Sequence, residues 1–342
     1  MTEPVNIAVV GSGYWGPNLI RNVAMLPEAR LHTVCDLNPK ALEQNARRYP
    51  GTRTTPDFDS VLKDPDVYGV ILATPASTHA EMALAALDAG KHVMVEKPLA
   101  MSSQAALRLI EKAETNGLVL MAGHVFEFNP AVIALRDLVQ SGRLGRILYL
   151  YSARVNLGVI RDDLNVMWNL APHDFSILNF VLQSAPEAVS GRGFRLLGRD
   201  LEDVAFITVE YPGNIVAHVH VSWLDPNKTR RMTVVGDEKM AVYDDVSQDE
   251  RIRIYDKGVI RDSIPDAYGE FRLVTRSGDI YIPNLPTTEP LRAECAHFVE
   301  CIRTGRQPIS DGVDGYRVVR MLEAAQQSME QEGLPVRLEL ER

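Results

Sequence analysis

Six residues near the start of the chain, Gly11-Ser12-Gly13-Tyr14-Trp15-Gly16, have the spacing of a dinucleotide-binding turn. Glycines at these positions permit a tight turn and let a pyrophosphate approach backbone N–H groups at the start of a helix. The pattern alone is a weak signal. Here it follows an apolar strand at Val5–Val10 and opens a helical stretch at Tyr14–Leu26, which is the context that the motif requires. We therefore expect a dinucleotide on this turn, with Tyr14 and Trp15 beside it.

Asp36 follows the second predicted strand, Leu31–Cys35, at twenty residues beyond Gly16. A carboxylate there accepts hydrogen bonds from the adenosine ribose hydroxyls and repels a 2′-phosphate. No arginine follows Asp36 directly, which further favours NAD over NADP. The alternative is that Asp36 caps the helix that begins near Asn38-Pro39.

Two further segments end parallel strands at the edge where doubly wound folds bind their ligands. Ala73-Thr74-Pro75 ends the strand Tyr68–Ala73, and we expect it to line the nicotinamide ribose together with His79. For His79, which lies near a helix start, a capping or packing role is the alternative. Glu96-Lys97-Pro98 ends the strand His92–Val95, which places Lys97 at the same edge, although most lysines are simply solvated.

The order of the predicted elements changes near residue 125. Up to that point strands and helices alternate, including helices at Pro39–Arg48 and Ser103–Asn116, which indicates a parallel sheet covered on both faces. Beyond it, strands follow one another through short turns, and two helices close the chain. The sequence thus predicts a Rossmann domain over 1–125 and an α+β domain with a large, mostly antiparallel open sheet over 126–342, which binds substrate and forms an oligomer.

Composition excludes several classes of protein. The chain has 342 residues with 36 Lys+Arg against 45 Asp+Glu, so its net charge of −9 gives no bulk attraction for nucleic acid or an anionic membrane. No apolar run approaches the roughly 20 residues that span a bilayer, and the N-terminus lacks the features of a signal peptide. Three cysteines without metal-like spacing fit free thiols in the cytoplasm. His218 and His220 share a strand face, but no third ligand is evident and we expect no metal.

His173 precedes the predicted helix Phe175–Leu182, in Pro172-His173-Asp174, where taken alone it is more simply read as a structural residue. Taken together, the motifs resemble those of the glucose–fructose oxidoreductase/inositol dehydrogenase/MocA family. The resemblance rests on the glycine turn, on Glu96-Lys97-Pro98, on Pro172-His173-Asp174 and on Gly123-His124 with Phe128-Asn129-Pro130-Ala131. It covers nearly the whole chain, including Glu289–Gly312.

Within that family, two further segments look like the branch of sugar-nucleotide 3-dehydrogenases, which includes enzymes that oxidise UDP-N-acetylglucosaminuronate in polysaccharide synthesis. They are Ser152–Gly158 and Val221–Lys228. The resemblance implies that the chain oxidises a ring hydroxyl with NAD, and that Lys97 and His173 form the catalytic pair. Histidine has a pKa suited to removing the hydroxyl proton, and the lysine can stabilise the alkoxide.

Many relatives carry an aspartate four residues before the histidine, where this chain has Asn169. An amide cannot accept a proton, so we expect Asn169 to orient substrate, with a local capping role as the alternative. Arg154 and Asn156 are two apart on an extended segment and share one face, where they could bind a hydroxyl, carboxylate or phosphate of the substrate. The alternative for this pair is a solvated strand edge.

Two other functions remain open from the sequence. One is a dehydrogenase of a free cyclitol or monosaccharide, such as inositol. The other is a non-catalytic NAD-binding regulator, since the family includes a repressor branch; the acidic charge and the absence of a DNA-binding segment disfavour it. An open sheet leaves an apolar face to be covered, so we expect a homodimer or homotetramer.

Overall fold

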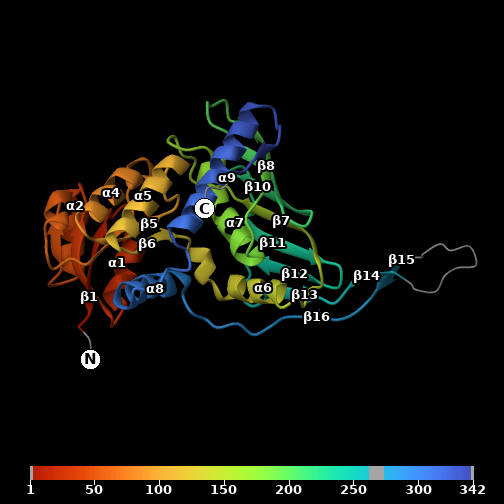
Figure 1. Cartoon of the computed structure of the whole chain (residues 1–342), viewed down its shortest axis with the longest axis horizontal. Coiled ribbons are helices and arrows are strands. Elements are labelled where there is room, and N and C mark those ends of the chain that lie inside the picture. The colour runs from red at the N-terminus through yellow and green to blue at the C-terminus, as the bar shows by residue number, and fades with distance from the viewer. Residues whose placement is uncertain (1–2, 262–272, 340–342) are drawn as a thin grey trace, which may run out of the picture. The chain divides into compact units, whose positions relative to one another are not determined.

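The computed structural model describes residues 3–261 and 273–339, which fold as two units (Figure 1). Within the described residues, one unit comprises 3–129 and 288–320, and the other comprises 130–261, 273–287 and 321–339. The boundary lies four residues beyond the predicted one. The structure also assigns Thr288–Arg320 to the first unit, whereas the sequence interpretation left it in the second domain.

The first unit is built on a six-stranded, all-parallel sheet of order β3-β2-β1-β4-β5-β6. Strand β4 is buried along its whole length, as expected for a parallel sheet with helices on both faces. The strands are β1 Val5–Val10, β2 Ala29–Cys35, β3 Arg53–Thr55, β4 Gly69–Leu72, β5 His92–Glu96 and β6 Leu120–Gly123. The helices are α1 Gly16–Met25, α2 Pro39–Arg48, α3 Phe58–Leu62, α4 His79–Asp88 and α5 Ser103–Asn116, with short 3-10 turns η1 Ala76–Thr78 and η2 Val125–Phe128.

Helix α8, Pro290–Thr304, returns to this unit from far along the chain and packs beside α1 (light blue in Figure 1). Its apolar face contributes Cys295, Phe298 and Val299 to the core that lies against Val9 and Leu19. Burial of these side chains, at about 25 cal/mol per Å² of apolar surface, stabilises the returning segment. Helix α9, Gly312–Glu330, begins in the first unit and ends in the second.

The second unit contains a nine-stranded mixed sheet of order β16-β13-β12-β11-β7-β10-β9-β8-β17. Its central strand β7 runs parallel to β10, and all the other pairs are antiparallel. The predicted fold class is confirmed. The strands are β7 Ile147–Val155, β8 Ala188–Phe194, β9 Val204–Tyr211, β10 Ile215–Ser222, β11 Thr229–Gly236, β12 Met240–Asp244, β13 Ile252–Tyr255, β16 Ile280–Tyr281 and β17 Val336–Arg337. Strands β14 Gly258–Arg261 and β15 Leu273–Arg276 form a separate ribbon.

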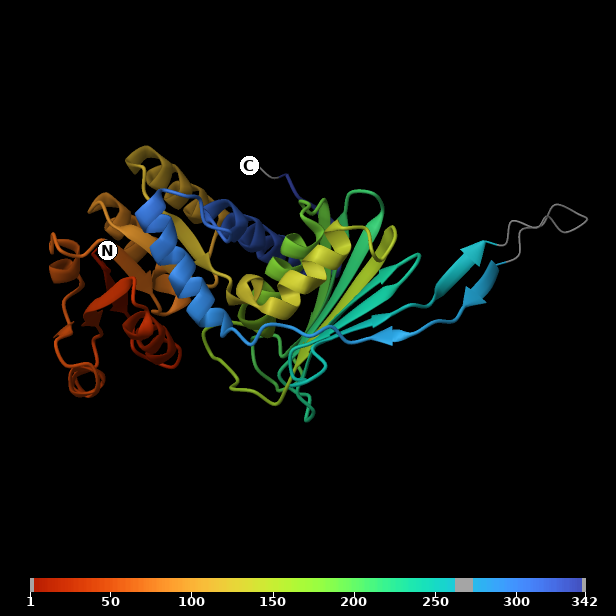
Figure 2. The same cartoon turned by 90° about the horizontal axis from the view of Figure 1, so that it is seen from below.

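Helices α6, Pro130–Gln140, and α7, Val166–Leu182, pack together on one face of this sheet (Figure 2). Along β7, β9 and β10 the other face carries exposed aromatic side chains. His218 and His220 belong to it, and both stack on Phe206, with the His220 and Phe206 ring centroids 4.4 Å apart. This arrangement fits the interpretation of the two histidines as sheet-face residues. The exposed aromatics on this face include Tyr149, Tyr151 and Phe206.

Helix α7 begins nine residues earlier than the predicted start at Phe175, so the prediction for this segment was wrong. The side chain of Asn165 caps the helix by accepting a hydrogen bond from the backbone N–H of Trp168 at 3.0 Å. Pro172 lies inside the helix, where proline removes a backbone hydrogen bond and normally disfavours a helix. Burial of Trp168 and Phe175 on either side of it offsets that cost.

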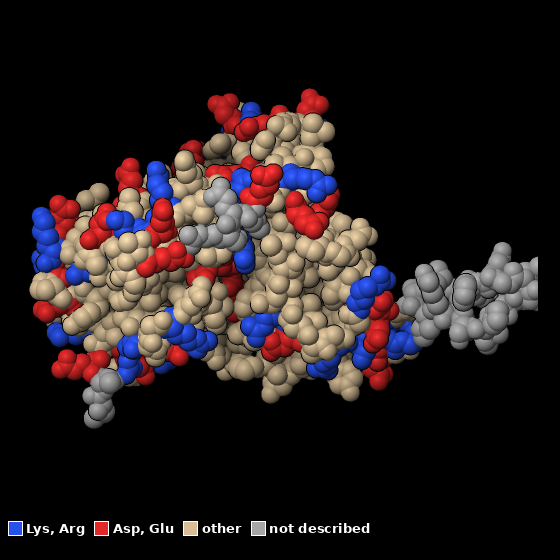
Figure 3. All heavy atoms as spheres, in the orientation of Figure 1, with Lys and Arg blue, Asp and Glu red and all other residues tan. Residues whose placement is uncertain are grey.

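Charges of both signs are interspersed over the face that Figure 3 shows.

Among the helices of the described chain, none is long and apolar enough to cross a lipid bilayer. The three cysteines are free and buried.

A buried hydrogen bond between Tyr211 and Asn179 generates a stability prediction. The Tyr211 hydroxyl donates to Asn179 Oδ1 at 2.9 Å and is 1% exposed. Tyr211→Phe leaves that acceptor buried without this donor, which costs about 1–3 kcal/mol of unfolding free energy. We expect a lower urea midpoint with an unchanged slope. Tyr281→Phe, at a position 65% exposed, is the matched control, and equal midpoints for the two variants would contradict the prediction.

Candidate functional site

The turn between β1 and α1 is shaped by glycines. Gly11 has φ +92°, and a Cβ there would lie 2.6 Å from the carbonyl oxygen of Ala73. At Gly16 a Cβ would overlap the carbonyl oxygen of Gly11. Both positions therefore require glycine for packing within the protein. Gly13 differs, because a Cβ there meets no atom within 4 Å. The space beside Gly13 is what an approaching ligand needs.

The start of α1 is suited to a phosphate group. Its N-cap residue, Trp15, makes no side-chain capping bond, and no acidic residue lies in the first turn. Helix N-termini carry backbone N–H groups that lack partners within the helix and favour an anion. The residues present therefore fit a dinucleotide whose pyrophosphate lies on Gly11, Gly13 and Gly16.

Asp36 connects the end of β2 to this turn. Its Oδ2 accepts a hydrogen bond from the backbone N–H of Ser12 at 2.5 Å, and its Oδ1 accepts one from Asn38 at 2.7 Å. The cap of α2 is Asn38, whose side chain accepts from the backbone N–H of Lys40. Asp36 thus lies next to the glycine turn, as a ribose-binding carboxylate must, while also ordering the loop before α2. Its role towards the ribose remains a prediction.

Trp15 links the turn to the end of β5. Its indole N–H donates to Glu96 Oε1 at 2.6 Å. Burial raises the pKa of Glu96 to about 7, opposed by the neighbouring charge of Lys97 and by the Trp15 hydrogen bond. The carboxyl group that precedes Lys97 therefore titrates near neutral pH. Lys97 itself follows β5 directly, at the carboxyl edge of the parallel sheet.

His79 is almost fully buried and ties two loops of the first unit together. Its Nδ1 lies 2.8 Å from the carbonyl oxygen of Pro98, and its Nε2 lies 2.9 Å from that of Thr74. Burial lowers its pKa, and the two carbonyl contacts oppose that shift. The packing alternative describes these contacts well: His79 holds the end of β4 against the segment that follows β5. Ala73, Thr74 and Pro75 lie at that strand end, beside Gly11.

In the second unit, Asn169 and His173 are four residues apart on α7, so their side chains lie on the same face of the helix. The sequence interpretation had placed both on a short stretch before the predicted helix. Both side chains are half-buried. Because a helix fixes their spacing, the two can address neighbouring atoms of one substrate.

Asp174 anchors α7 to the central strand β7. Its Oδ1 accepts a hydrogen bond from the Ser152 hydroxyl at 2.5 Å, and its Oδ2 lies 2.6 Å from Nε of Arg154. All three side chains are buried. The alternative of a solvated strand edge for Arg154 is therefore wrong, because β7 is the middle of the sheet. Asn156 lies just beyond the end of β7, and whether it or Arg154 touches substrate stays a prediction.

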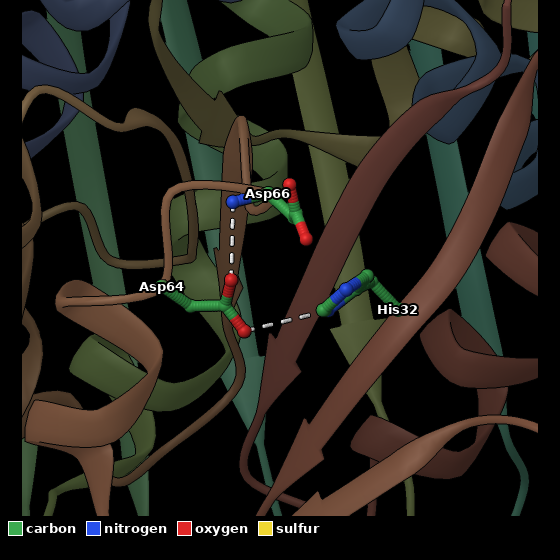
Figure 4. A group of neighbouring side chains, drawn as sticks. All are labelled: His32, Asp64 and Asp66. Carbon is green, nitrogen blue, oxygen red and sulfur yellow. Dashed lines mark hydrogen bonds and ion pairs between the residues drawn. The ribbon is translucent and has the colours of Figure 1, made fainter.

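The described residues contain two groups whose side chains could share a metal ion, and the sequence singled out neither. The first, His32, Asp64 and Asp66, lies near the surface (Figure 4). Asp64 already accepts a hydrogen bond from the backbone N–H of Asp66 at 3.0 Å and pairs with Arg53 at 2.9 Å. The Asp64 carboxylate therefore already has a hydrogen-bond donor and a cationic partner within the protein. We assign no function to the group of His32, Asp64 and Asp66.

Comparisons with known proteins agree with this geometry. Residues 5–124 match the model of an oxidoreductase family with an NAD-binding Rossmann fold, and residues 132–242 match the GFO/IDH/MocA C-terminal domain. The scyllo-inositol 2-dehydrogenase (NAD(+)) of Bacillus subtilis is 28% identical over 354 residues, covering 100% of this chain and 98% of that one.

Two solved structures are similar over almost the whole chain. UDP-N-acetylglucosamine 3-dehydrogenase GnnA from Acidithiobacillus ferrooxidans has a TM-score of 0.81 and 26% identity, covering 97% of this chain and 99% of that one. GenD2 from gentamicin A biosynthesis, solved in complex with NAD, has a TM-score of 0.82 and 25% identity. The similarity covers 99% of this chain and 97% of that one.

Two glycine variants separate cofactor binding from packing. Gly13→Ala adds a methyl group where the protein leaves space, so we expect an unchanged unfolding temperature and an NAD dissociation constant raised about ten-fold or more. Gly16→Ala overlaps the Gly11 carbonyl, so we expect it to lower the unfolding temperature as well. Calorimetric titration with NAD and thermal unfolding measure both effects. Wild-type NAD affinity in the Gly13 variant would show that the pyrophosphate lies elsewhere.

Proposed function

Because this chain belongs to the Gfo/Idh/MocA family, and is an NAD-dependent oxidoreductase of sugar or cyclitol hydroxyls, we propose that its substrate is a sugar nucleotide oxidised at C3 of the ring. The proposed substrate class is a UDP-N-acetylhexosamine or the corresponding uronate. The similarity to a UDP-N-acetylglucosamine 3-dehydrogenase over nearly the whole chain supports this choice.

The observation that carries the proposal is the position of two segments that resemble the sugar-nucleotide branch. Ser152–Gly158 leaves β7, and Val221–Lys228 leaves β10. The two strands are parallel neighbours, with Val155 opposite Ser222, and the backbone N–H of Asn156 donates to the Ser222 carbonyl at 3.1 Å. Both segments therefore emerge at one edge of the sheet, where they can bind a single ligand.

In the proposed reaction, His173 accepts the proton of the substrate hydroxyl and Lys97 stabilises the negative charge that develops on that oxygen. The glycine turn of Gly11, Gly13 and Gly16 would hold NAD, which would supply the hydride acceptor for the ring carbon. The protein contributes orientation and electrostatics, and a well-oriented pair can lower the barrier by several kcal/mol.

The polar residues next to His173 on α7 support the proposal that this histidine acts as a base without passing its proton to a carboxylate. Asn169 shares its helix face and can orient a hydroxyl, but it cannot take a proton. Asp174, the next residue, is bonded to Ser152 and Arg154 instead. Arg154 therefore contributes at least by holding α7 on β7. Contact of Arg154 and Asn156 with the sugar nucleotide is part of the proposal.

A second substrate class is favoured by a specific observation. The Bacillus subtilis relative, whose sequence this chain matches end to end, is a scyllo-inositol dehydrogenase. A free cyclitol or monosaccharide presents the same secondary alcohol to Lys97 and His173, and lacks only the nucleotide. The two classes therefore differ in what binds at the ends of β7 and β10.

We also propose that the protein works as a homodimer or homotetramer in the cytoplasm. The face of the nine-stranded sheet opposite α6 and α7 exposes Tyr149, Tyr151 and Phe206, and burying such a patch against a second copy is favourable. The free thiols of all three cysteines are consistent with a reducing compartment.

Removing the Lys97 ammonium should abolish most of the turnover. We expect Lys97→Ala to lower kcat by about 100-fold or more, because the developing alkoxide loses its charged partner. Absorbance of NADH measures the rate, and thermal unfolding confirms the fold. Lys63→Ala, at an exposed position where the lysine pairs with Asp59, is the control. Undiminished turnover in Lys97→Ala would refute the assigned role.

A substrate panel distinguishes the two classes. We expect NADH formation with UDP-N-acetylglucosamine or its uronate at a kcat/KM at least about ten-fold above that with scyllo-inositol, myo-inositol or glucose, since the nucleotide adds binding energy. A preference for the free polyols would replace the sugar nucleotide by a cyclitol and leave the assignment as a dehydrogenase intact.

A further inference from the structure

The first unit contains a second group of potential metal ligands, and this one is buried. His124 follows β6, Glu127 lies in η2, and Asp314 lies in the first turn of α9. His124 and Glu127 are each 1% exposed. The His124 Nδ1 lies 2.5 Å from Asp314 Oδ2 and 3.3 Å from Glu127 Oε1. One ligand atom from each of the three lies within 4.8 Å of the others.

An independent observation on α8 indicates that something is bound here. Glu294 is 0% exposed, and neither of its carboxylate oxygens has a hydrogen-bond partner among residues 3–261 and 273–339. Its carboxyl group interacts electrostatically with those of Glu96 and Glu127 and with the His124 ring. The Nε2 atom of His124 also lacks a partner in the described chain. Buried polar atoms are nearly always paired, because leaving them unpaired is costly.

The cluster is rich in buried carboxyl groups. Glu127 and Asp314 contact the imidazole of His124, and Glu294 is buried. Burial raises the pKa of Glu127 and of Glu294 well above the ordinary value, which disfavours their charged forms as long as no cation lies beside them. A further carboxyl group, that of Glu96, interacts with Glu294 and adds to the negative potential. A cation held between these oxygens would neutralise them and supply the missing partners.

We propose that His124, Glu127 and Asp314 bind one divalent metal ion of the Mn²⁺ or Zn²⁺ type, with the buried Glu294 carboxyl group adding negative potential beside them. Imidazole and carboxylate ligands suit these ions. In a tetrahedral site with bonds of about 2.1 Å, neighbouring ligand atoms are about 3.4 Å apart, which the His124–Glu127 separation of 3.3 Å already matches. The shorter His124–Asp314 contact must open by about 1 Å when the ion replaces the shared proton.

The ion joins parts of the chain that are far apart in sequence. His124 and Glu127 belong to the end of the parallel sheet, whereas Glu294 and Asp314 belong to the segment Thr288–Arg320 that returns to it. Binding therefore stabilises the attachment of that segment to the nucleotide-binding unit, by an amount that depends on the metal concentration. The role is structural and does not depend on the proposed substrate.

The experiment is a titration of the chelator-treated full chain with Mn²⁺, followed by electron paramagnetic resonance and repeated with Zn²⁺ by calorimetry. We expect one ion per chain and a higher unfolding temperature in its presence. Glu127→Gln and Glu294→Gln keep the side-chain shape, and we expect each to weaken binding about ten-fold or more. Asp66→Asn alters the exposed His32 group and serves as the control, with wild-type affinity expected.

Two results would overturn the proposal. One is a wild-type chain that binds neither ion stoichiometrically at millimolar concentration, a result that needs no variant. The other is stoichiometric binding that the Glu127→Gln and Glu294→Gln variants keep at full affinity. The first result would mean that protons balance the cluster, and Glu294→Gln would then raise the unfolding temperature.

Discussion

The close approach of the Gly11–Gly16 turn to the end of β4 is the constraint on which the nucleotide-binding site depends. A side chain at Gly11 or Gly16 would collide with backbone atoms, so this geometry exists only with glycine. The turn is then fixed from two sides, by Asp36 at the end of β2 and by Glu96 at the end of β5. The start of α1 and the residue that precedes Lys97 are thereby held in one rigid frame.

The second unit positions its histidine by a different means. A buried ion pair between Arg154 and Asp174 connects α7 to the central strand of the sheet. The Ser152 hydroxyl donates a further hydrogen bond to the same carboxylate. Removing one partner of a buried pair leaves an uncompensated charge and costs several kcal/mol. The position of His173, one residue from Asp174, is therefore determined by packing and not by a flexible loop.

The sequence predicted what local patterns encode and missed what tertiary contacts decide. Periodicity and capping signals placed helices α2 and α5 to the residue. The start of α7 was missed because Pro172 argues against a helix, and only burial of its neighbours outweighs that preference. The return of α8 to the first unit depends on contact with α1, far away in sequence. Glu294 gave no signal, because a glutamate in a helix is normally exposed and only the fold buries it.

Transfer of a hydride from C3 of a sugar-nucleotide ring to NAD can be followed directly with an isotope. UDP-N-acetylglucosamine, or its uronate, is prepared with deuterium at C3 and turned over with NAD, and the mass of the reduced cofactor is measured. We expect NADH that is heavier by one mass unit. Unlabelled NADH, or bound NAD that neither labelled substrate reduces, would contradict this transfer.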